Sequence, residues 1–180
     1  SDHFNTKLYT GNASSSHAIT GVGFKPDWVW IKNRDTTGNH GVWDIVRGAT
    51  EQLYPNQNYG ESTAANSLKS FNTDGFTVGS DGDQNGSGND LVSWNWLADN
   101  TTGSSNTDGS ITSTVSANTT AGFSIVKYDG TRPSVSTVGH GLGATPSVIW
   151  FKSLNAAQGW RCWFGNGGFD NQSFLTLNST

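Results

Sequence analysis

The sequence predicts an all-β protein, and three observations support this prediction. Five segments alternate in a period of two and are rich in β-branched and aromatic residues. Gly, Pro, Asn and Asp bound these segments, as they do where strands end in turns. No window of about ten or more residues has apolar residues at sustained helical spacing. We therefore expect antiparallel strands that pack as a β-sandwich.

The predicted strands are spread over the whole chain. They are residues 27–32, 75–78, 91–97, 123–128 and 147–152. Residues 28–31 and 148–151 are apolar on both strand faces, which is typical of strands that are covered on both sides. We expect both segments to be central strands of a sandwich.

Two other segments have local signals. Ser62 or Thr63 can cap a short helix over residues 62–70. Asn-Thr-Asp-Gly at 72–75 predicts a hairpin turn. Cys162 is the single cysteine, so no intrachain disulfide is available, and we expect it to pack as a small hydrophobe.

Residues 22–32 resemble residues 142–152, and this similarity predicts an internal repeat. The pairs that lie 120 positions apart are Pro26 and Pro146, Trp30 and Trp150, Lys32 and Lys152, and Trp43 and Trp163. We expect Pro26 and Pro146 to open equivalent strands. For the repeated tryptophans, core packing is the expected role.

The repeat suggests a division of the chain into three parts. Residues 1–97 form a first β repeat, and residues 98–122 form a Ser/Thr/Asn/Gly-rich connector with an added strand near 111–115. Residues 123–180 form a partial second repeat that lacks the late strands of the first. We expect this part to merge with the first repeat into one sandwich. The alternative is that its unpaired edge binds a neighbouring chain.

Composition excludes two classes of partner. Charged residues make up 13% of the chain, about half the usual ~25%. The net charge is −4 and no basic patch exists, so we expect no nucleic-acid partner. No apolar run approaches the ~18 residues of a membrane span. The sequence contains no Met, so we expect a processed piece or fragment of a longer polypeptide.

The sequence carries no recognisable catalytic set. A sandwich-fold glycosidase needs two carboxylates that flank one bond. Glu51 and Glu61 are the only glutamates, and both lie in a turn-rich stretch. No serine lies in a Gly-x-Ser-x-Gly elbow. We therefore expect no catalytic residues and no enzymatic activity.

One loop resembles the first half of a calcium-binding loop. Asp81, Asp83 and Asn85 place oxygen ligands at alternate positions. Val92 stands where the closing Glu would be, so Asp90 is the candidate substitute. The turn-forming tendency of Asp and Asn explains the same pattern without a metal. Calcium is the one cofactor that the sequence suggests.

Several tryptophans are candidates for stacking on sugar rings. Trp94 and Trp96 share one face of the predicted strand 91–97. Trp160 has no aromatic counterpart in the first repeat and lies in a loop beside Arg161, so we expect it to be exposed. Core packing is the competing interpretation for each ring. The predicted carbohydrate-binding residues are Trp160, Arg161, Trp94 and Trp96.

The chain resembles an uncharacterised repeat domain of marine, cyanophage-like tail-fibre and virion structural proteins. The motifs that support this resemblance lie at residues 9–11, 21–34, 46–50, 67–76, 107–110, 122–126 and 138–143. The resemblance implies a concanavalin-like or lectin-like jelly-roll sandwich with a surface role. It implies no catalytic residues.

Two functional hypotheses follow. The first is a non-enzymatic structural or adhesive part of a phage tail fibre or virion appendage, extracellular or on the virion surface. Its partners are then host-surface or extracellular glycans, other virion proteins or further copies of itself. The alternative is a carbohydrate-binding module of a secreted bacterial polysaccharide-degrading enzyme.

Overall fold

The computed structural model describes residues 2–131, 135–165 and 174–178. One short helix, α1 (Gly82–Asn85), accompanies the strands. The strands are β1 (Phe4–Thr10), β2 (His17–Thr20), β3 (Trp28–Asn33), β4 (Gly41–Asp44), β5 (Glu51–Gln52), β6 (Ser62–Thr63), β7 (Leu68–Asn72), β8 (Gly75–Val78), β9 (Asp90–Trp96), β10 (Ser104–Asn106), β11 (Ser113–Asn118), β12 (Phe123–Tyr128), β13 (Val148–Phe151), β14 (Arg161–Phe164) and β15 (Leu175–Thr176). Within the described ranges, no helix has the length and apolarity needed to cross a membrane.

The all-β prediction is confirmed, and the ladders between the named strands are antiparallel. The five predicted strands form as β3, β8, β9, β12 and β13, with ends within one residue of the expected positions. The added strand expected near 111–115 forms as β11, slightly later in the chain. Period-two alternation therefore identified these strands, whereas β1, β4 and β14 were not predicted from it.

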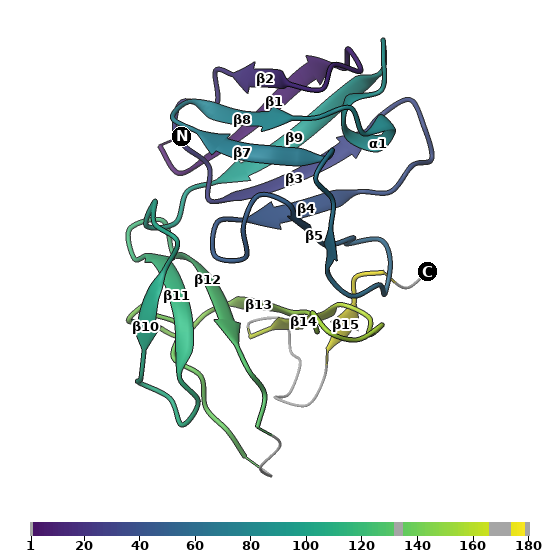
Figure 1. The fold of residues 1–180 in the computed structure, drawn as a ribbon. Helices are drawn as coiled ribbons and strands as arrows, with labels where there is room; N and C mark the ends of the chain where they lie inside the picture. The colour runs from purple at the N-terminus through teal and green to yellow at the C-terminus, as the bar shows by residue number, and fades with distance from the viewer. Residues whose placement is uncertain (1, 132–134, 166–173, 179–180) are drawn as a thin grey trace.

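Two sheets of the first half enclose one hydrophobic core. One sheet has the strand order β1-β9-β3-β4 and the other β2-β8-β7 (Figure 1). Alternation along β3 turns Val29 and Ile31 into this core, while Trp28 and Trp30 point to the opposite face. The buried core residues are Ile19, Val22, Val29, Ile31, Trp43, Leu68, Phe76, Val78 and Leu91.

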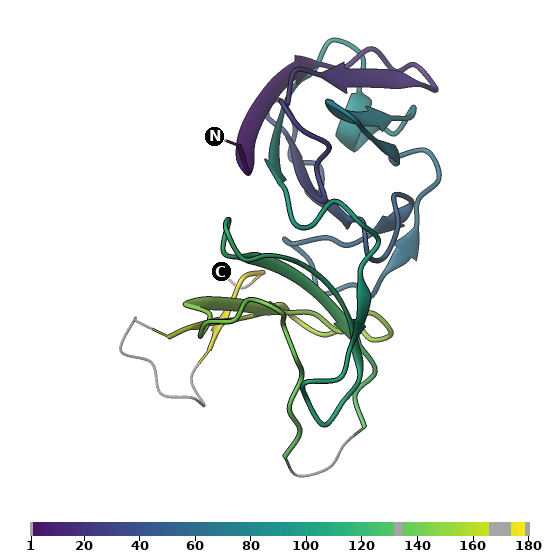
Figure 2. The same cartoon turned by 90° about the vertical axis from the view of Figure 1, so that its left-hand side faces the viewer.

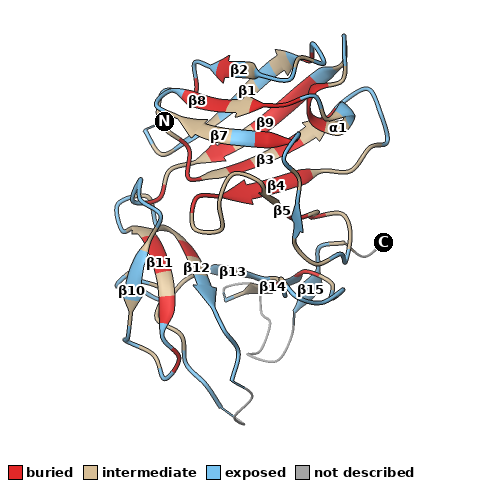
Figure 3. Cartoon of the chain, viewed as in Figure 1, coloured by how far each residue is buried: buried red, intermediate tan, exposed pale blue. Residues whose placement is uncertain are grey.

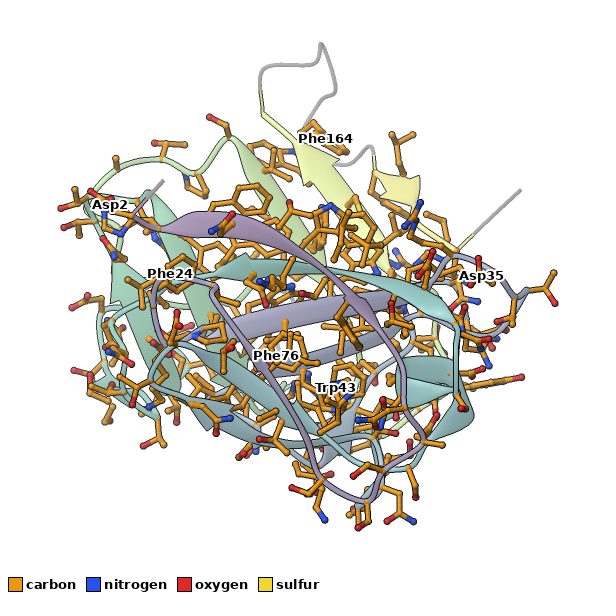
Figure 4. The ribbon with its side chains drawn as sticks, turned by 90° about the horizontal axis from the view of Figure 1, so that it is seen from above. Asp2, Phe24, Asp35, Trp43, Phe76 and Phe164 are labelled. Carbon is orange, nitrogen blue, oxygen red and sulfur yellow. The ribbon has the colours of Figure 1, made fainter. Side chains whose placement is uncertain are left out.

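Trp43 and Phe76 show how the two sheets share this core. Trp43 comes from β4 and Phe76 from β8, and both side chains are 0% exposed. Seen from above, they lie in the middle of the molecule, whereas Phe164 of β14 lies near its edge (Figure 4). The core expectation for Trp43 is therefore confirmed, whereas its repeat counterpart Trp163 is only half-buried.

The helix predicted over residues 62–70 is wrong. This segment forms the short strand β6 and then β7, joined by a turn in which the Ser67 N–H donates to Ala64 O at 3.0 Å. Leu68 lies opposite Val78 in the β7–β8 hairpin and is fully buried. Burial of this side chain in the core outweighs the weak local capping signal.

The predicted hairpin turn at 72–75 is confirmed. Asn72 and Gly75 are paired where β7 meets β8. Gly75 has a φ of +145°, a conformation that side chains rarely adopt. A Cβ atom at this position would also collide with the Ile19 carbonyl oxygen of β2. The turn therefore requires glycine both for its backbone and for the close approach of β2.

The strands of residues 104–176 form two further sheets, β10-β11-β12 and β13-β14-β15, which lie below the first half in Figures 1 and 2. These described strands pair with one another rather than with the sheets of the first half. The expected addition of strands from residues 123–180 to the first sheets is therefore not seen among them. The halves meet through side chains and loops instead.

The β13–β14 hairpin has the same strand register as the β3–β4 hairpin. In the first hairpin, Val29 lies opposite Trp43. In the second, Ile149 lies opposite Trp163, and each of these positions is 120 residues later in the chain. The strands that follow Pro26 and Pro146 thus share this local pairing, and the internal repeat as a whole stays a prediction.

The expectation that β13 is covered on both faces is wrong. Trp150 is 39% exposed and Phe151 is 43% exposed, whereas Ile31 on β3 is 0% exposed. Figure 3 shows the contrast between the largely buried β4, β8 and β9 of the first half and the exposed β13 and β15. The physical reason is that the second sheet β2-β8-β7 covers the core face of β3, whereas neither buried core cluster includes a residue of β13, and that β13 pairs with β14 alone among the described strands.

Candidate functional site: the aromatic seam and its surroundings

A group of aromatic rings joins the two halves, and we call it the aromatic seam. Its first-half rings lie on the face of the β1-β9-β3-β4 sheet that is opposite the core, because side chains alternate along each strand. The members of the seam are Phe4, Trp28, Trp30, Trp94, Trp96, Phe123 and Trp150.

Strand register brings the tryptophans of the first half together. Trp28 lies directly opposite Trp96, and Trp30 lies directly opposite Trp94, across the β3–β9 ladder. Directly opposed residues in antiparallel strands have Cβ atoms about 5 Å apart, close enough for large rings to pack. The sequence spacing on two separate strands therefore builds a compact set of four indoles.

Trp30 lies at the centre of the seam. Its ring packs edge to face on Trp94, with centroids 5.9 Å apart, and on Trp150 of the second half, at 5.8 Å. Its indole N–H donates to His40 Nδ1 at 3.0 Å. Burial, together with the nearby positive charge of Lys32, lowers the pKa of His40. A neutral imidazole is the form that can accept this hydrogen bond at Nδ1.

Phe123 anchors the start of β12 on the same face. Its ring stacks on Trp96 with an interplanar angle of 24° and a centroid separation of 6.2 Å. It also meets Trp28 edge to face at 6.4 Å. On its other side, Trp96 contacts Phe4, with centroids 4.7 Å apart. The second half is thus docked at two places, through Phe123 and through Trp150.

Polar contacts also join the halves. The Trp160 indole N–H donates to Tyr54 O at 2.9 Å, and the Glu61 N–H donates to Leu154 O at 2.8 Å. The exposure predicted for Trp160 is therefore wrong, since this ring is 2% exposed and its polar atom is bound to the other half. Its ring cannot offer a flat face to a sugar.

The other predicted carbohydrate-binding residues are not gathered in one place. Arg161 is exposed, and its guanidinium carbon lies 4.2 Å from the centroid of the Phe174 ring. Trp94 and Trp96 are half-buried within the seam. The structure therefore places Arg161 on a second-half surface and the two tryptophans at the contact between the halves.

The predicted calcium ligands stabilise the loop that contains α1 through hydrogen bonds of their side chains. Asp81 caps this helix, with Oδ1 accepting from the Asp83 N–H at 2.9 Å and Oδ2 accepting from Ser67 Oγ at 2.8 Å. Asn85 is 0% exposed, and its side-chain amide donates to Gly79 O at 2.8 Å. These oxygens and amides already have protein partners, as expected for a polar loop that stabilises its own turn.

The remaining two candidates also have protein partners. Asp83 Oδ2 accepts from the Asn39 N–H at 3.2 Å, and Asp90 Oδ1 accepts from Thr10 Oγ1 at 3.3 Å. In the described part of the chain, His, Cys, Asp and Glu side chains form no group of three or more that could hold a metal ion. Calcium binding by this loop remains a prediction.

A polar surface loop was missed in the sequence. Tyr59 is 52% exposed and packs edge to face on Tyr54, with ring centroids 5.8 Å apart. Nearby, Asn39 Oδ1 accepts from Asn56 Nδ2 at 3.0 Å and from Gln57 Nε2 at 3.1 Å. We call residues 54–59 the tyrosine–amide loop. Its composition of tyrosine and side-chain amides was the available signal.

The glutamates have structural partners. Arg47 Nη1 lies 2.9 Å from Glu61 Oε2, and Arg47 Nε lies 2.5 Å from Asp44 Oδ2. Glu51 accepts from Thr63 Oγ1 at 3.2 Å. The carboxylates of this region therefore hold the segment that follows β4 in place, with Arg47 as the shared, buried donor.

Cys162 lies inside the β13-β14-β15 sheet region. It is 3% exposed and lies opposite Trp150 on one side and Leu175 on the other. Burial raises the pKa of its thiol. The expectation that Cys162 packs as a small hydrophobe is confirmed.

One of three comparisons with known proteins gave a match to this chain. Neither the curated proteins nor the solved structures contain a match to it. One family model, described as a domain of unknown function (DUF7483), matches residues 1–180. Because this match covers the whole chain, the protein belongs to the DUF7483 family.

Proposed function

We propose that this chain is a non-enzymatic structural and adhesive module of an extracellular or virion-surface appendage, such as a phage tail fibre. The observation that supports this proposal most is the pair of hairpins with equal register, β3–β4 and β13–β14, joined through Trp30 and Trp150. Chains built from stacked, related units grow in length by adding units, which suits a fibre.

The proposed organisation is a repeat of about 120 residues in a β-sandwich of the concanavalin-like jelly-roll kind. Residues 1–97 are the first repeat, 98–122 the connector and 123–180 the partial second repeat. Two sheets around one core in the first half support the sandwich. Left-handed glycines support the repeat, since Gly21 (φ +80°) and Gly141 (φ +72°) lie 120 positions apart.

The partners in this proposal are glycans, other virion proteins and further copies of the chain. Exposed aromatic rings beside polar groups are the sites we assign to sugars, because such rings stack on the apolar faces of sugar rings. Among the described residues, we select two such surfaces. They are Tyr59 in the tyrosine–amide loop and Phe174 beneath Arg161.

A glycan array tests the adhesive part of the proposal. We expect binding to at least one bacterial or algal glycan, weakened at least about tenfold by Tyr59→Ala or by Arg161→Ala. Tyr128→Ala is the matched control, since this ring is exposed (42%) but lies on β12, outside both surfaces. Binding that no variant weakens, or no binding at all, would contradict the assigned sites.

The non-enzymatic part has its own test. The purified chain should release no reducing ends from common polysaccharides, because its glutamates are held by Arg47 and Thr63 rather than paired across a substrate site. Release of reducing ends that a single Asp or Glu substitution abolishes would show that the chain is an enzyme.

The second candidate function is a carbohydrate-binding module of a secreted bacterial polysaccharide-degrading enzyme. The same exposed rings support it, so glycan binding alone does not separate the two proposals. The parent reading frame does. Neighbouring fibre repeats would support the appendage module, whereas a linked hydrolase domain would support the carbohydrate-binding module.

A further inference from the structure

We infer that the edge of β13 that no described strand pairs takes up an antiparallel strand of the β9 type from a partner polypeptide. This inference rests on the equivalence of the β3–β4 and β13–β14 hairpins proposed above. It adds a specific interaction surface and the kind of polypeptide segment that fits it.

The backbone of β13 shows which groups are free to pair. In an antiparallel strand, alternate residues direct both N–H and C=O to the same neighbour. The bond from the Gly165 N–H to Ser147 O, at 2.9 Å, shows that odd-numbered positions face β14. Val148, Trp150 and Lys152 therefore direct their backbone groups to the other edge, where no described strand is paired.

The first half shows what occupies the corresponding edge. The bond from the Ile45 N–H to Asp27 O, at 2.8 Å, is the equivalent closing bond of the β3–β4 hairpin. On the opposite edge of β3, the Arg34 N–H donates to Asp90 O at 2.8 Å, which opens the β3–β9 ladder. The edge that is free on β13 is thus the edge that β9 fills on β3.

The burial of apolar side chains also differs between the two hairpins. Ile31 is fully buried, whereas its counterpart Phe151 is 43% exposed. Val29 is fully buried, whereas Ile149 is only half-buried. An apolar strand face next to an unpaired edge is the surface on which strand addition occurs.

The lysine at this edge does not oppose strand addition. Charged lysines on edge strands normally prevent pairing. Here the Lys152 ammonium donates to Ser153 O at 2.8 Å, as Lys32 donates to Asn33 O in the first half. Lys32 lies opposite Val92 within the complete β3–β9 ladder. A lysine in this arrangement is therefore compatible with a paired strand.

The occupant is a strand of the β9 type rather than the β13 edge of a second copy. Two β13 edges paired about a twofold axis would satisfy the backbone but would place a copy of β13 where the first half has β9. In the first half, β9 adds Leu91, which is 0% exposed, to the core beside Val29 and Ile31. A strand with this pattern pairs the edge in the register that β9 has on β3 and extends the apolar face by a side chain of the Leu91 type.

A labelled peptide with the sequence of residues 88–98 tests this inference on the full chain. We expect saturable binding by fluorescence anisotropy and slower hydrogen exchange at the Val148, Trp150 and Lys152 amides. Val148→Pro removes only an outward N–H and should weaken binding about tenfold. Phe151→Ser should also weaken it, and the free variant should remain folded by circular dichroism, because Phe151 is 43% exposed.

Two controls accompany the peptide. Val135→Pro changes a valine that is 82% exposed and lies outside β13, so it should leave binding unchanged. A scrambled peptide of the same composition should not bind. Equal binding of the scrambled peptide, no binding of the native sequence, or self-association of the chain that protects the β13 amides without peptide would each overturn the inference. Slow exchange at these three amides in the free monomer would instead refute the hairpin equivalence itself.

Discussion

The rings of Trp30 and Trp150 meet edge to face, with centroids 5.8 Å apart, although these residues lie at the same position of two hairpins 120 residues apart in the chain. The contact is thus made between equivalent positions of two similar hairpins. Trp94 and His40 contact the same Trp30 ring from the first half. A single indole therefore couples the docking of the second half to the packing of the first.

A double-mutant cycle on Trp30 and Trp150 should reveal this coupling. Trp150→Ala should lower the free energy of unfolding by about 2 kcal/mol, because the ring is partly exposed. The coupling energy between the two substitutions should be about 0.5–1.5 kcal/mol, as for other edge-to-face pairs. Urea unfolding of the four proteins measures it. Phe151→Ala with Trp30→Ala serves as control, and a coupling near zero for the tryptophan pair would contradict the contact.

The hydrogen bond between Trp30 and His40 predicts a loss of stability in mild acid. The pKa of His40 is lowered in the folded state, so the unfolded chain, with a pKa of about 6.5, gains a proton first as the pH falls. The contribution of neutral His40 is complete above that value and is lost as the pH falls towards the folded-state pKa. Unfolding experiments between pH 7.5 and 5 should show this loss, and His40→Gln should reduce it. An equal pH dependence in both proteins would rule out His40 as its cause.

Arg47 should be one of the most sensitive positions in the first half. Its side chain is 5% exposed and bridges Asp44, at 3% exposure, and Glu61, at 22%. Removing the cation leaves a buried carboxylate without its partner, which typically costs about 3–5 kcal/mol. Chemical denaturation of Arg47→Met should show a loss of this size. The exposed Arg161→Ala should change stability by less than about 0.5 kcal/mol.

The strands β3, β8, β9, β11, β12 and β13 could be predicted from the sequence, but β1, β4 and β14 and the direction of the strand faces could not. Alternation correctly placed Val92, Trp94 and Trp96 on one face of β9, with Ser93 and Asn95 on the other. Ser93 and Asn95 are nevertheless 0% exposed and lie on the core side. A period of two identifies residues that share a face, whereas the choice of the inner face depends on which sheets pack together.

The candidate site was harder to predict because its contacts join segments that are far apart in the chain. Trp160 lies in a loop rich in small residues and was expected to be exposed, but its indole reaches Tyr54 O in the other half. No local pattern near Trp160 indicates this partner. By contrast, the similarity of residues 22–32 and 142–152 made Trp30 and Trp150 detectable as corresponding positions, although their mutual contact was not.

Asp27 should make the stability of the protein depend on pH in a direction opposite to that of most carboxyl groups. Burial raises its pKa, although its Oδ2 accepts from the N–H groups of Ala98 and Asn100, each at 2.8 Å. Because the folded-state pKa lies above the unfolded value of about 4, the contribution of Asp27 is greatest below that pH. It is then lost as the pH rises through the folded-state pKa.

Asp27→Asn keeps a side-chain oxygen for the two backbone donors and removes the titration. The stability of Asp27→Asn relative to the wild type should therefore increase between pH 4 and pH 7, as measured by urea unfolding. Asp27→Ala loses both hydrogen bonds and should be less stable than Asp27→Asn by about 1–3 kcal/mol at every pH. Asp129→Asn, at an exposed position, controls for the loss of one negative charge. If the difference between Asp27→Asn and the wild type stays constant with pH, burial of the Asp27 carboxylate does not control its titration.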